Sequence, residues 1–76
     1  MDEAELAKRF SHHPPGKGTI PVHEYLRSEF RFMAGRVASL GPSRETSLAL
    51  TALEEGLMWA NAHVARNLDP DTGTPR

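Results

Sequence analysis

Two series of mainly apolar residues run along the chain with helical spacing. The first consists of Val22, Leu26, Phe30, Met33, Val37 and Leu40, and the second of Thr46, Leu50, Leu53, Leu57, Ala60 and Val64. Because steps of three and four residues return to the same side of an α-helix, each series marks one helix face. The pattern therefore predicts two long helices, one over Val22–Leu40 and one over Ser43–Asn67.

The residues between these helices predict a tight turn. Gly41 suits the end of a helix, Pro42 cannot continue one, and Ser43 can accept an amide hydrogen bond at the start of the next helix. A connection this short favours antiparallel neighbours whose apolar faces close on each other. We therefore predict an all-α fold, an antiparallel helical hairpin.

The segment before the hairpin predicts a short helix and a loop. Asp2–Arg9 has acidic residues first and basic residues last, which is the charge order that suits a helix. Phe10–Pro21 carries paired prolines and two glycines, which exclude regular structure. Phe10 and Ile20 are apolar and could pin this segment down, so we expect an ordered loop.

A chain of 76 residues forms one domain at most. Residues 68–76 hold two prolines and a glycine without periodicity, so we expect a single domain over residues 1–67 and a disordered tail over 68–76. At this size folding buries only about 60% of the surface of the unfolded chain. With no cysteine to form a disulfide, we expect several copies to assemble into an oligomer.

Large apolar side chains lie off the two helix seams and support the same expectation. They are Tyr25, Phe32, Leu48, Met58 and Trp59. Such side chains have no partner within a two-helix hairpin, so they need either another subunit or a ligand.

Charge and hydropathy argue against two classes of protein. A formal net charge of −1 does not suit a domain that binds bulk DNA or RNA. No segment approaches the roughly 18 apolar residues of a membrane span, and the N-terminus lacks the apolar core of a signal peptide. We therefore expect a cytosolic chain whose partners include neither bulk nucleic acid nor a membrane.

Polar groups at both ends of the second predicted helix indicate a binding site. Arg44 and Glu45 lie in its first turn, beside the positive end of the helix dipole. Trp59, Asn61 and Arg66 lie near its C-terminal end. Groups of this kind are suited to holding a phosphorylated nucleotide.

Two segments resemble a known family. The loop Phe10-Ser11-His12-His13-Pro14-Pro15 and the second helix, SRETSLALTALEEGLMWANAHVARN, are similar to the bacteriophage family of small anti-defence sponge proteins. Members of that family antagonise CBASS and Thoeris immunity by sequestering cyclic nucleotide signals. The likeness covers about half of the chain, and its most specific parts are the S-R-E, M-W-A-N-A and A-R-N groups.

The resemblance implies a function and an assembly. It implies a helical hairpin that forms a homo-oligomer, a hexamer, and binds cyclic oligonucleotides or cyclic ADP-ribose isomers without cleaving them. It also implies a place of action in the cytoplasm of the infected bacterial host. His12 and Ala52 stand where members of the family commonly carry tyrosine and lysine, so the resemblance indicates the class of ligand and not its identity.

The chemistry of a cyclic nucleotide selects candidate residues. Its bases need aromatic or guanidinium faces, and its phosphates need N–H donors. The candidate stacking faces are Phe10, His12, His13 and Trp59; the candidate donors are Lys17, Arg44 and Arg66, with Glu45 beside them and Asn61 facing a base edge or ribose. Arg27 and Arg31, one turn apart, fit a solvated helix face instead.

Four of the candidates also have a structural explanation. Trp59 is of the type that commonly anchors interfaces, and Arg66 suits the C-terminal end of the helix dipole. Arg44 and Glu45 could be solvated charges. A helical protein-interaction or structural module with no small-molecule ligand therefore remains the alternative hypothesis. A helix-turn-helix DNA binder is weaker still, because the near-neutral charge and the short turn count against it.

No catalytic or metal centre is indicated. The four histidines, His12, His13, His23 and His63, fit no metal-binding motif. Glu54 and Glu55 are adjacent on a helix and point about 100° apart, so they do not form a carboxylate pair. No nucleophile is placed beside a base. We therefore predict a non-enzyme without a metal or cofactor.

Overall fold

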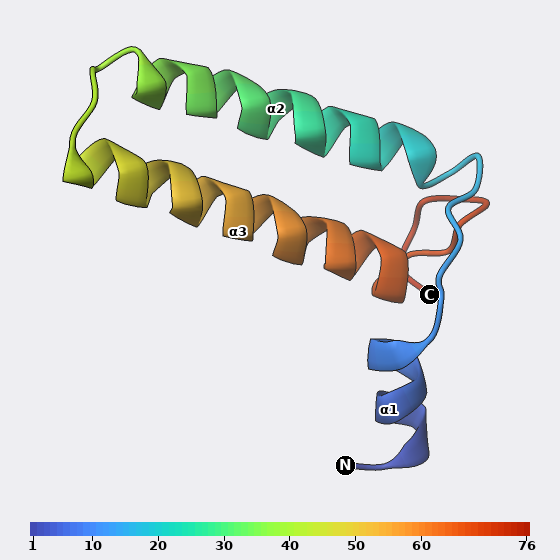
Figure 1. Ribbon diagram of the computed structural model, residues 1–76. Helices are drawn as coiled ribbons and strands as arrows, with labels where there is room; N and C mark the ends of the chain where they lie inside the picture. The colour runs from blue at the N-terminus through green and yellow to red at the C-terminus, as the bar shows by residue number, and fades with distance from the viewer.

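The computed structural model describes residues 1–76 and consists of a long antiparallel helical hairpin with a short helix standing apart from it (Figure 1). The helices are α1 (Glu3–Phe10), α2 (Ile20–Ala38) and α3 (Arg44–Asn67). No strand is present, and α2 packs along α3. The predicted all-α helical hairpin is confirmed. None of the three helices combines the length and the apolar character that crossing a membrane demands.

The boundaries of α2 differ by two residues from the prediction. The helix begins at Ile20 rather than Val22, because Pro21 occupies the first turn, where an amide hydrogen is not needed. It ends at Ala38, and Leu40 lies in the turn with 79% of its surface exposed. Leu40 is therefore not a seam residue, because the chain has already left the helix at this point.

The turn between α2 and α3 has the predicted chemistry. Gly41 adopts a φ of 109°, a left-handed conformation that favours glycine. The hydroxyl of Ser43 accepts a hydrogen bond from the amide of Thr46 at 3.0 Å, and the amide of Ser43 donates to the Thr46 hydroxyl, also at 3.0 Å. This reciprocal capping box satisfies two amides at the start of α3. The predicted cap at Ser43 is confirmed.

The seam of α3 is confirmed, whereas that of α2 needs a second correction besides Leu40. Every predicted α3 seam residue is at least half-buried, and Val64 is the most buried at 4% exposure. On α2, Met33 is 49% exposed and the adjacent Ala34 lies against α3 instead. The residues three and four positions after Phe30, Met33 and Ala34, both lie near the same helix face, and the packing against α3 selects Ala34.

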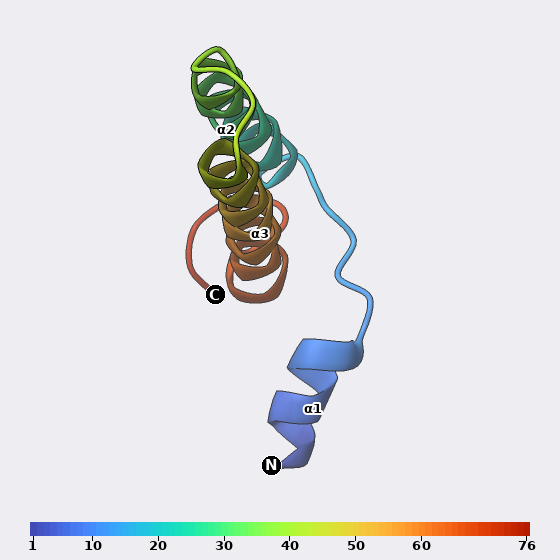
Figure 2. The same cartoon turned by 60° about the vertical axis from the view of Figure 1, so that its left-hand side comes forward.

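The hairpin is only one layer thick, and its core is small. Figure 2, turned by 60° from Figure 1, shows α2 and α3 packed against each other without a further covering element. Val64 and Thr19 are the only buried residues. The large side chains predicted to lack a partner are exposed by half or more: Tyr25, Phe32, Leu48, Met58 and Trp59.

The tail differs from the expectation of disorder. Residues 68–76 turn back and lie beside the loop that precedes α2, as the red and cyan segments of Figure 1 show. Leu68 and Pro75 form an isolated antiparallel bridge, and the amide of Gly18 donates to the carbonyl of Pro70 at 2.8 Å. Proline and glycine exclude helix here, but they also permit tight turns whose hydrogen bonds order the segment.

The loop before α2 is ordered, but the apolar side chains that were predicted to hold it do not do so. Phe10 is the last residue of α1 and is 81% exposed, and Ile20 is 44% exposed, so neither apolar side chain anchors the loop. The loop is instead held by main-chain hydrogen bonds from Gly18 and Thr19 to the tail. Backbone groups can provide this hold because glycine lets two chain segments approach without side chains between them.

Candidate functional site

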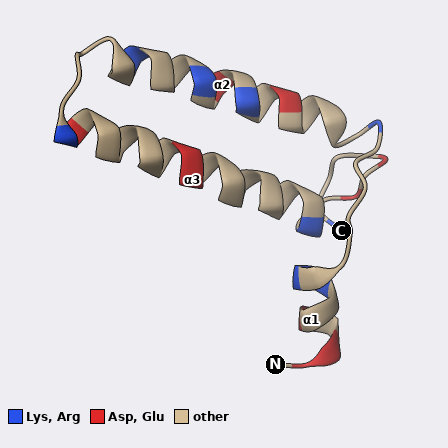
Figure 3. Cartoon of the chain, viewed as in Figure 1, with Lys and Arg blue, Asp and Glu red and all other residues tan.

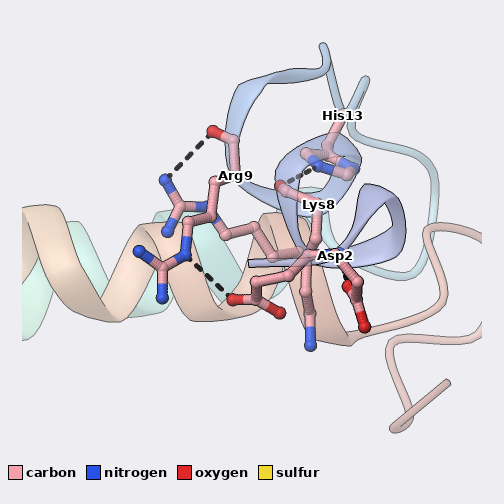
Figure 4. Close-up of polar contacts among 6 residues, drawn as sticks. Asp2, Lys8, Arg9 and His13 are labelled. Atoms are coloured by element: carbon pink, nitrogen blue, oxygen red, sulfur yellow. Dashed lines mark hydrogen bonds and ion pairs between the residues drawn. The ribbon is translucent and has the colours of Figure 1, made fainter.

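The N-terminal arm, defined here as residues 1–15, is a self-stabilised helix followed by an extended segment. The carboxylate of Asp2 accepts a hydrogen bond from the amide of Glu5 at 2.9 Å and so caps α1 (Figure 4). Glu5 and Arg9 form an ion pair at 2.9 Å. No residue of α1 is buried. Local interactions therefore form this helix, and α2 and α3 leave it uncovered.

Two candidate ligand residues, His13 and Arg66, bind the carbonyl end of α1. The Nε2 atom of His13 lies 2.7 Å from the carbonyl oxygen of Lys8, and the Nη2 atom of Arg66 donates to the carbonyl of Arg9 at 3.5 Å (Figure 4). The second bond is long and therefore weak. The guanidinium of Arg66 carries five N–H groups, so the others remain available for an anion.

Phe10, His12 and Lys17 are exposed on the arm and loop. The Phe10 ring is 81% exposed, and no side-chain hydrogen bond occupies either His12 or Lys17. These side chains extend the set of accessible groups around the end of the hairpin that carries the arm. They are free to contact a ligand or another chain.

Trp59 and Asn61 lie two residues apart on α3 but have different surroundings. Trp59 is 69% exposed, so its ring face is available for stacking. The Oδ1 atom of Asn61 lies 2.7 Å from the Nδ1 atom of His23, and this half-buried pair joins α3 to α2. Asn61 thus already has a partner within the chain.

Arg44 and Glu45 lie at the opposite end of α3. The 22 residues from Arg44 to Arg66 correspond to about 33 Å along the helix axis at 1.5 Å per residue. Within one chain Trp59 lies 15 residues from Arg44, about 22 Å along the same axis, and Arg66 and the arm lie farther away. The candidate residues therefore form two groups, and a single small ligand bound to one chain can contact only one of them.

Charged side chains of both signs lie along the whole molecule. Figure 3 shows basic residues on the arm, the loop, the end of α3 and the C-terminus, all at the end of the hairpin that carries the arm. They are Lys8, Arg9, Lys17, Arg66 and Arg76. No group of three or more His, Asp or Glu side chains is arranged to hold a metal ion. Acidic residues lie at the same end: Asp2, Glu3, Glu5, Asp69 and Asp71. The charges at the arm end therefore balance, and contact with an anion there depends on individual basic side chains.

A groove of about 380 Å³ lies between α2 and α3. Its floor is apolar and includes Phe30, Leu50, Leu53 and Leu57, and its rim carries Arg27, Arg31 and Glu54. Arg27 and Arg31 are exposed, in agreement with a solvated face, but they also border this groove. The i, i+4 spacing of Arg27 and Arg31 places them on one face of α2, and this could be read from the sequence. The groove could not, because its other wall is formed by α3, which is distant in sequence.

One family model matches most of the chain. A family model described as Acb2/Tad1, hairpin domain, matches residues 2–65. The chain belongs to the Acb2/Tad1 hairpin-domain family. This is the phage anti-CBASS and anti-Thoeris sponge family, so the resemblance noted in the sequence is confirmed. No curated protein and no solved structure matches the chain.

The Acb2/Tad1 match includes the arm, the loop, α2 and nearly all of α3. All the candidate ligand residues except Arg66 lie within it. The tail over residues 68–76 lies outside it. Acb2/Tad1 hairpin domains belong to proteins that bind signals rather than convert them, which agrees at the family level with the prediction of a non-enzyme.

Proposed function

We propose that this protein binds and sequesters a cyclic oligonucleotide or a cyclic ADP-ribose isomer without cleaving it. By doing so in the cytoplasm of an infected bacterium, it antagonises anti-phage signalling by CBASS or Thoeris. The observation that carries this proposal is the Acb2/Tad1 match over residues 2–65. The exposed aromatic and basic groups at the arm end of the hairpin support it.

Exposed rings supply the stacking surfaces in this proposal. Trp59 on α3 and Phe10 at the end of α1 have largely uncovered faces, and His12 follows in the arm. Stacking of a base on an aromatic ring contributes about 1–3 kcal/mol. Because every base has a flat face, this term favours nucleotides in general and leaves the choice among them to polar contacts.

Basic groups of the loop and of α3 supply the phosphate contacts. Lys17 is exposed, and Arg66 uses only one N–H for its bond to the carbonyl of Arg9. A guanidinium can hold two phosphate oxygens at once, whereas an ammonium acts as a point charge. His13 is engaged with Lys8 and is half-buried, so in this proposal it orients the arm and is not a principal ligand contact.

A second chain is needed to complete the proposed site. Arg44 and Glu45 lie about 33 Å along α3 from Arg66, so they reach the same ligand only when another copy brings its α3 N-terminus alongside. Oligomerisation also covers exposed apolar side chains, among them Phe32 and Met58. We propose a homo-oligomer, a hexamer, in which ligand is enclosed between chains.

A thermal-shift screen tests the proposal. The purified protein is heated with cyclic dinucleotides, cyclic trinucleotides and cyclic ADP-ribose isomers, each beside its linear counterpart as the matched control. A ligand present at one hundred times its dissociation constant stabilises the folded state by about 2.7 kcal/mol. The proposal requires a shift with at least one cyclic compound and a smaller shift with its linear form; no shift with any compound would contradict it.

Recovery of the ligand separates a sponge from an enzyme. The bound compound is released by denaturing the protein after prolonged incubation and is then separated by chromatography. A sponge returns the cyclic compound intact and in stoichiometric amount. A linear product that accumulates beyond one equivalent per site would overturn the non-catalytic part of the proposal.

The exposed apolar side chains favour one other candidate function, a protein-interaction module without a small-molecule ligand. Leu48, Met58 and Trp59 are each more than half exposed on α3 and fit a protein partner as well as a second copy. Sedimentation distinguishes the two. A protein that stays monomeric and binds no cyclic compound would favour the module, whereas a ligand-binding oligomer supports the sponge.

A further inference from the structure

The C-terminal tail forms a compact turn of its own. The Oδ1 atom of Asp69 accepts hydrogen bonds from the amides of Asp71, at 2.8 Å, and Thr72, at 3.2 Å. The amide of Gly73 donates to the carbonyl of Asp69 at 2.8 Å, and the amide of Asp69 donates to the carbonyl of Thr74 at 2.7 Å. All four bonds involve Asp69, two through its carboxylate and two through its main chain, so this residue organises the turn.

This turn lies directly against the loop before α2. The amide of Gly18 donates to the Pro70 carbonyl at 2.8 Å, and the amide of Thr19 lies 3.3 Å from the same oxygen. A Cβ atom added to Gly16 would lie 2.5 Å from that carbonyl oxygen, and one added to Gly18 would collide with the amide nitrogen of Gly73. The main-chain atoms of the loop and of the tail are in direct contact here, so no side chain fits between the two segments.

The contact is also the best-buried point outside the helix interface. Thr19 is 2% exposed, less than any other residue, and its hydroxyl accepts a hydrogen bond from the amide of Gly16 at 3.0 Å. Beyond this point the arm has one hydrogen bond to the rest of the chain, from Arg66 to the carbonyl of Arg9. The direction in which the arm leaves the hairpin therefore depends on the contact between loop and tail.

From this geometry we infer that residues 69–74 are a strap that fixes the base of the N-terminal arm and that ligand capture depends on it. The second part rests on the proposed function, because the arm carries Phe10 and His12. A site built on a preorganised arm avoids the entropic cost of ordering that arm on binding. The strap lies outside residues 2–65, so the family match does not include it.

Three variants of the full-length chain isolate the strap. Asp69→Ala removes the carboxylate that organises the turn. Asp69→Asn keeps an Oδ1 acceptor and is the conservative rescue. Asp71→Ala removes the same charge two residues away, where the carboxylate has no hydrogen bond. A chain that ends at Asn67 removes the strap outright and covers the case in which Asp69→Ala retains its turn.

Amide hydrogen exchange tests, in the absence of ligand, whether the strap holds the loop. In Asp69→Ala and in the truncated chain, exchange at Gly18 should accelerate by at least about tenfold, because its amide loses its acceptor on the tail. Exchange at Thr19 should accelerate less, because its amide also donates to the carbonyl of Gly16 at 3.1 Å. Exchange at Leu57, in the middle of α3, should change little. Asp69→Asn and Asp71→Ala should match the wild type. Unchanged protection of Gly18 in the truncated chain would overturn the inference.

Measurements of ligand affinity test whether ligand capture depends on the strap. With the cyclic compound found in the thermal-shift screen, Asp69→Ala and the truncated chain should bind at least about tenfold more weakly, and Asp69→Asn should bind as the wild type does. Accelerated exchange together with unchanged affinity would overturn the dependence of capture on the strap. If the wild type binds none of the compounds, the proposed function fails, and hydrogen exchange alone decides whether the strap holds the arm.

Discussion

The Nδ1 atom of His23 lies 2.7 Å from the Oδ1 atom of Asn61, and this contact joins the first turns of α2 to the last turns of α3. It is the only side-chain hydrogen bond between the two helices of the hairpin. The imidazole donates when Nδ1 carries the proton. Asn61, a candidate ligand residue, therefore also has a structural task.

Replacing Asn61 with alanine should destabilise the protein by about 1 kcal/mol, because the half-buried imidazole loses its acceptor. For a domain of this size that loss corresponds to a drop in Tm of about 4–8 °C. A double-mutant cycle with His23→Ala, followed by thermal unfolding, measures the coupling. Strictly additive effects would contradict the contact. If both single variants weaken ligand binding equally, Asn61 acts through the hairpin rather than on the ligand.

Replacing Ser43 with alanine should destabilise the protein by about 0.5–2 kcal/mol, since the variant loses the acceptor for the Thr46 amide at the start of α3. Urea unfolding monitored by circular dichroism measures the change. Ser47→Ala is the matched control, because Ser47 is exposed one turn later and its hydroxyl has no hydrogen bond. Equal effects of the two substitutions would argue against the capping box.

Gly35 and Gly56, one on each helix, should respond differently to alanine. A Cβ at Gly35 meets nothing within 4 Å, so Gly35→Ala should stabilise the monomeric hairpin by about 0.5–1 kcal/mol through helix propensity. A Cβ at Gly56 would lie 3.1 Å from Cε1 of Phe30. Gly56→Ala should therefore gain less than Gly35→Ala or lose stability.

The comparison of the two glycines is made by denaturant unfolding at a low protein concentration, which keeps chain association out of the measurement. Alanine at 56 that stabilises as much as alanine at 35 would mean that the Phe30 ring is not packed against α3 as described.

Trp59→Ala should separate ligand binding from folding. The indole is 69% exposed, so its removal should leave helicity near that of the wild type. The binding free energy for a cyclic nucleotide should weaken by about 1–3 kcal/mol, because the stacking is lost. Calorimetric titration measures the affinity, and circular dichroism measures the helicity. Val64→Ala is the contrasting variant, because burial of a valine contributes about 1.5–3 kcal/mol to stability. Loss of helicity in Trp59→Ala would favour a structural role for the indole.

Much of the fold could be predicted because it depends on local rules. The spacing from Leu50 to Val64 defines the buried face of α3, and Gly41 and Ser43 end one helix and begin the next. The error at Met33 shows the limit of such rules. Positions three and four residues after Phe30 both lie near the same face, and only the approach of α3 selects between them.

The candidate site was less predictable for a physical reason. Residue type indicates what Trp59, Asn61 or Arg66 can bind, but not whether another part of the chain already occupies it. The structure uses Asn61 for His23, Arg66 for the end of α1 and His13 for Lys8, and leaves Trp59 exposed. It also separates Arg44 from Arg66 by most of the length of α3.

By itself the sequence determined the helices to within about two residues, the cap at Ser43, the antiparallel turn and the membership of a sponge family, because these follow from neighbouring residues and from short motifs. Only the tertiary structure decided that residues 68–76 are ordered and that they hold the loop at Gly16 and Gly18. That contact joins main-chain atoms more than fifty residues apart. A main-chain contact leaves no periodic side-chain pattern, so only glycine and proline marked it in advance.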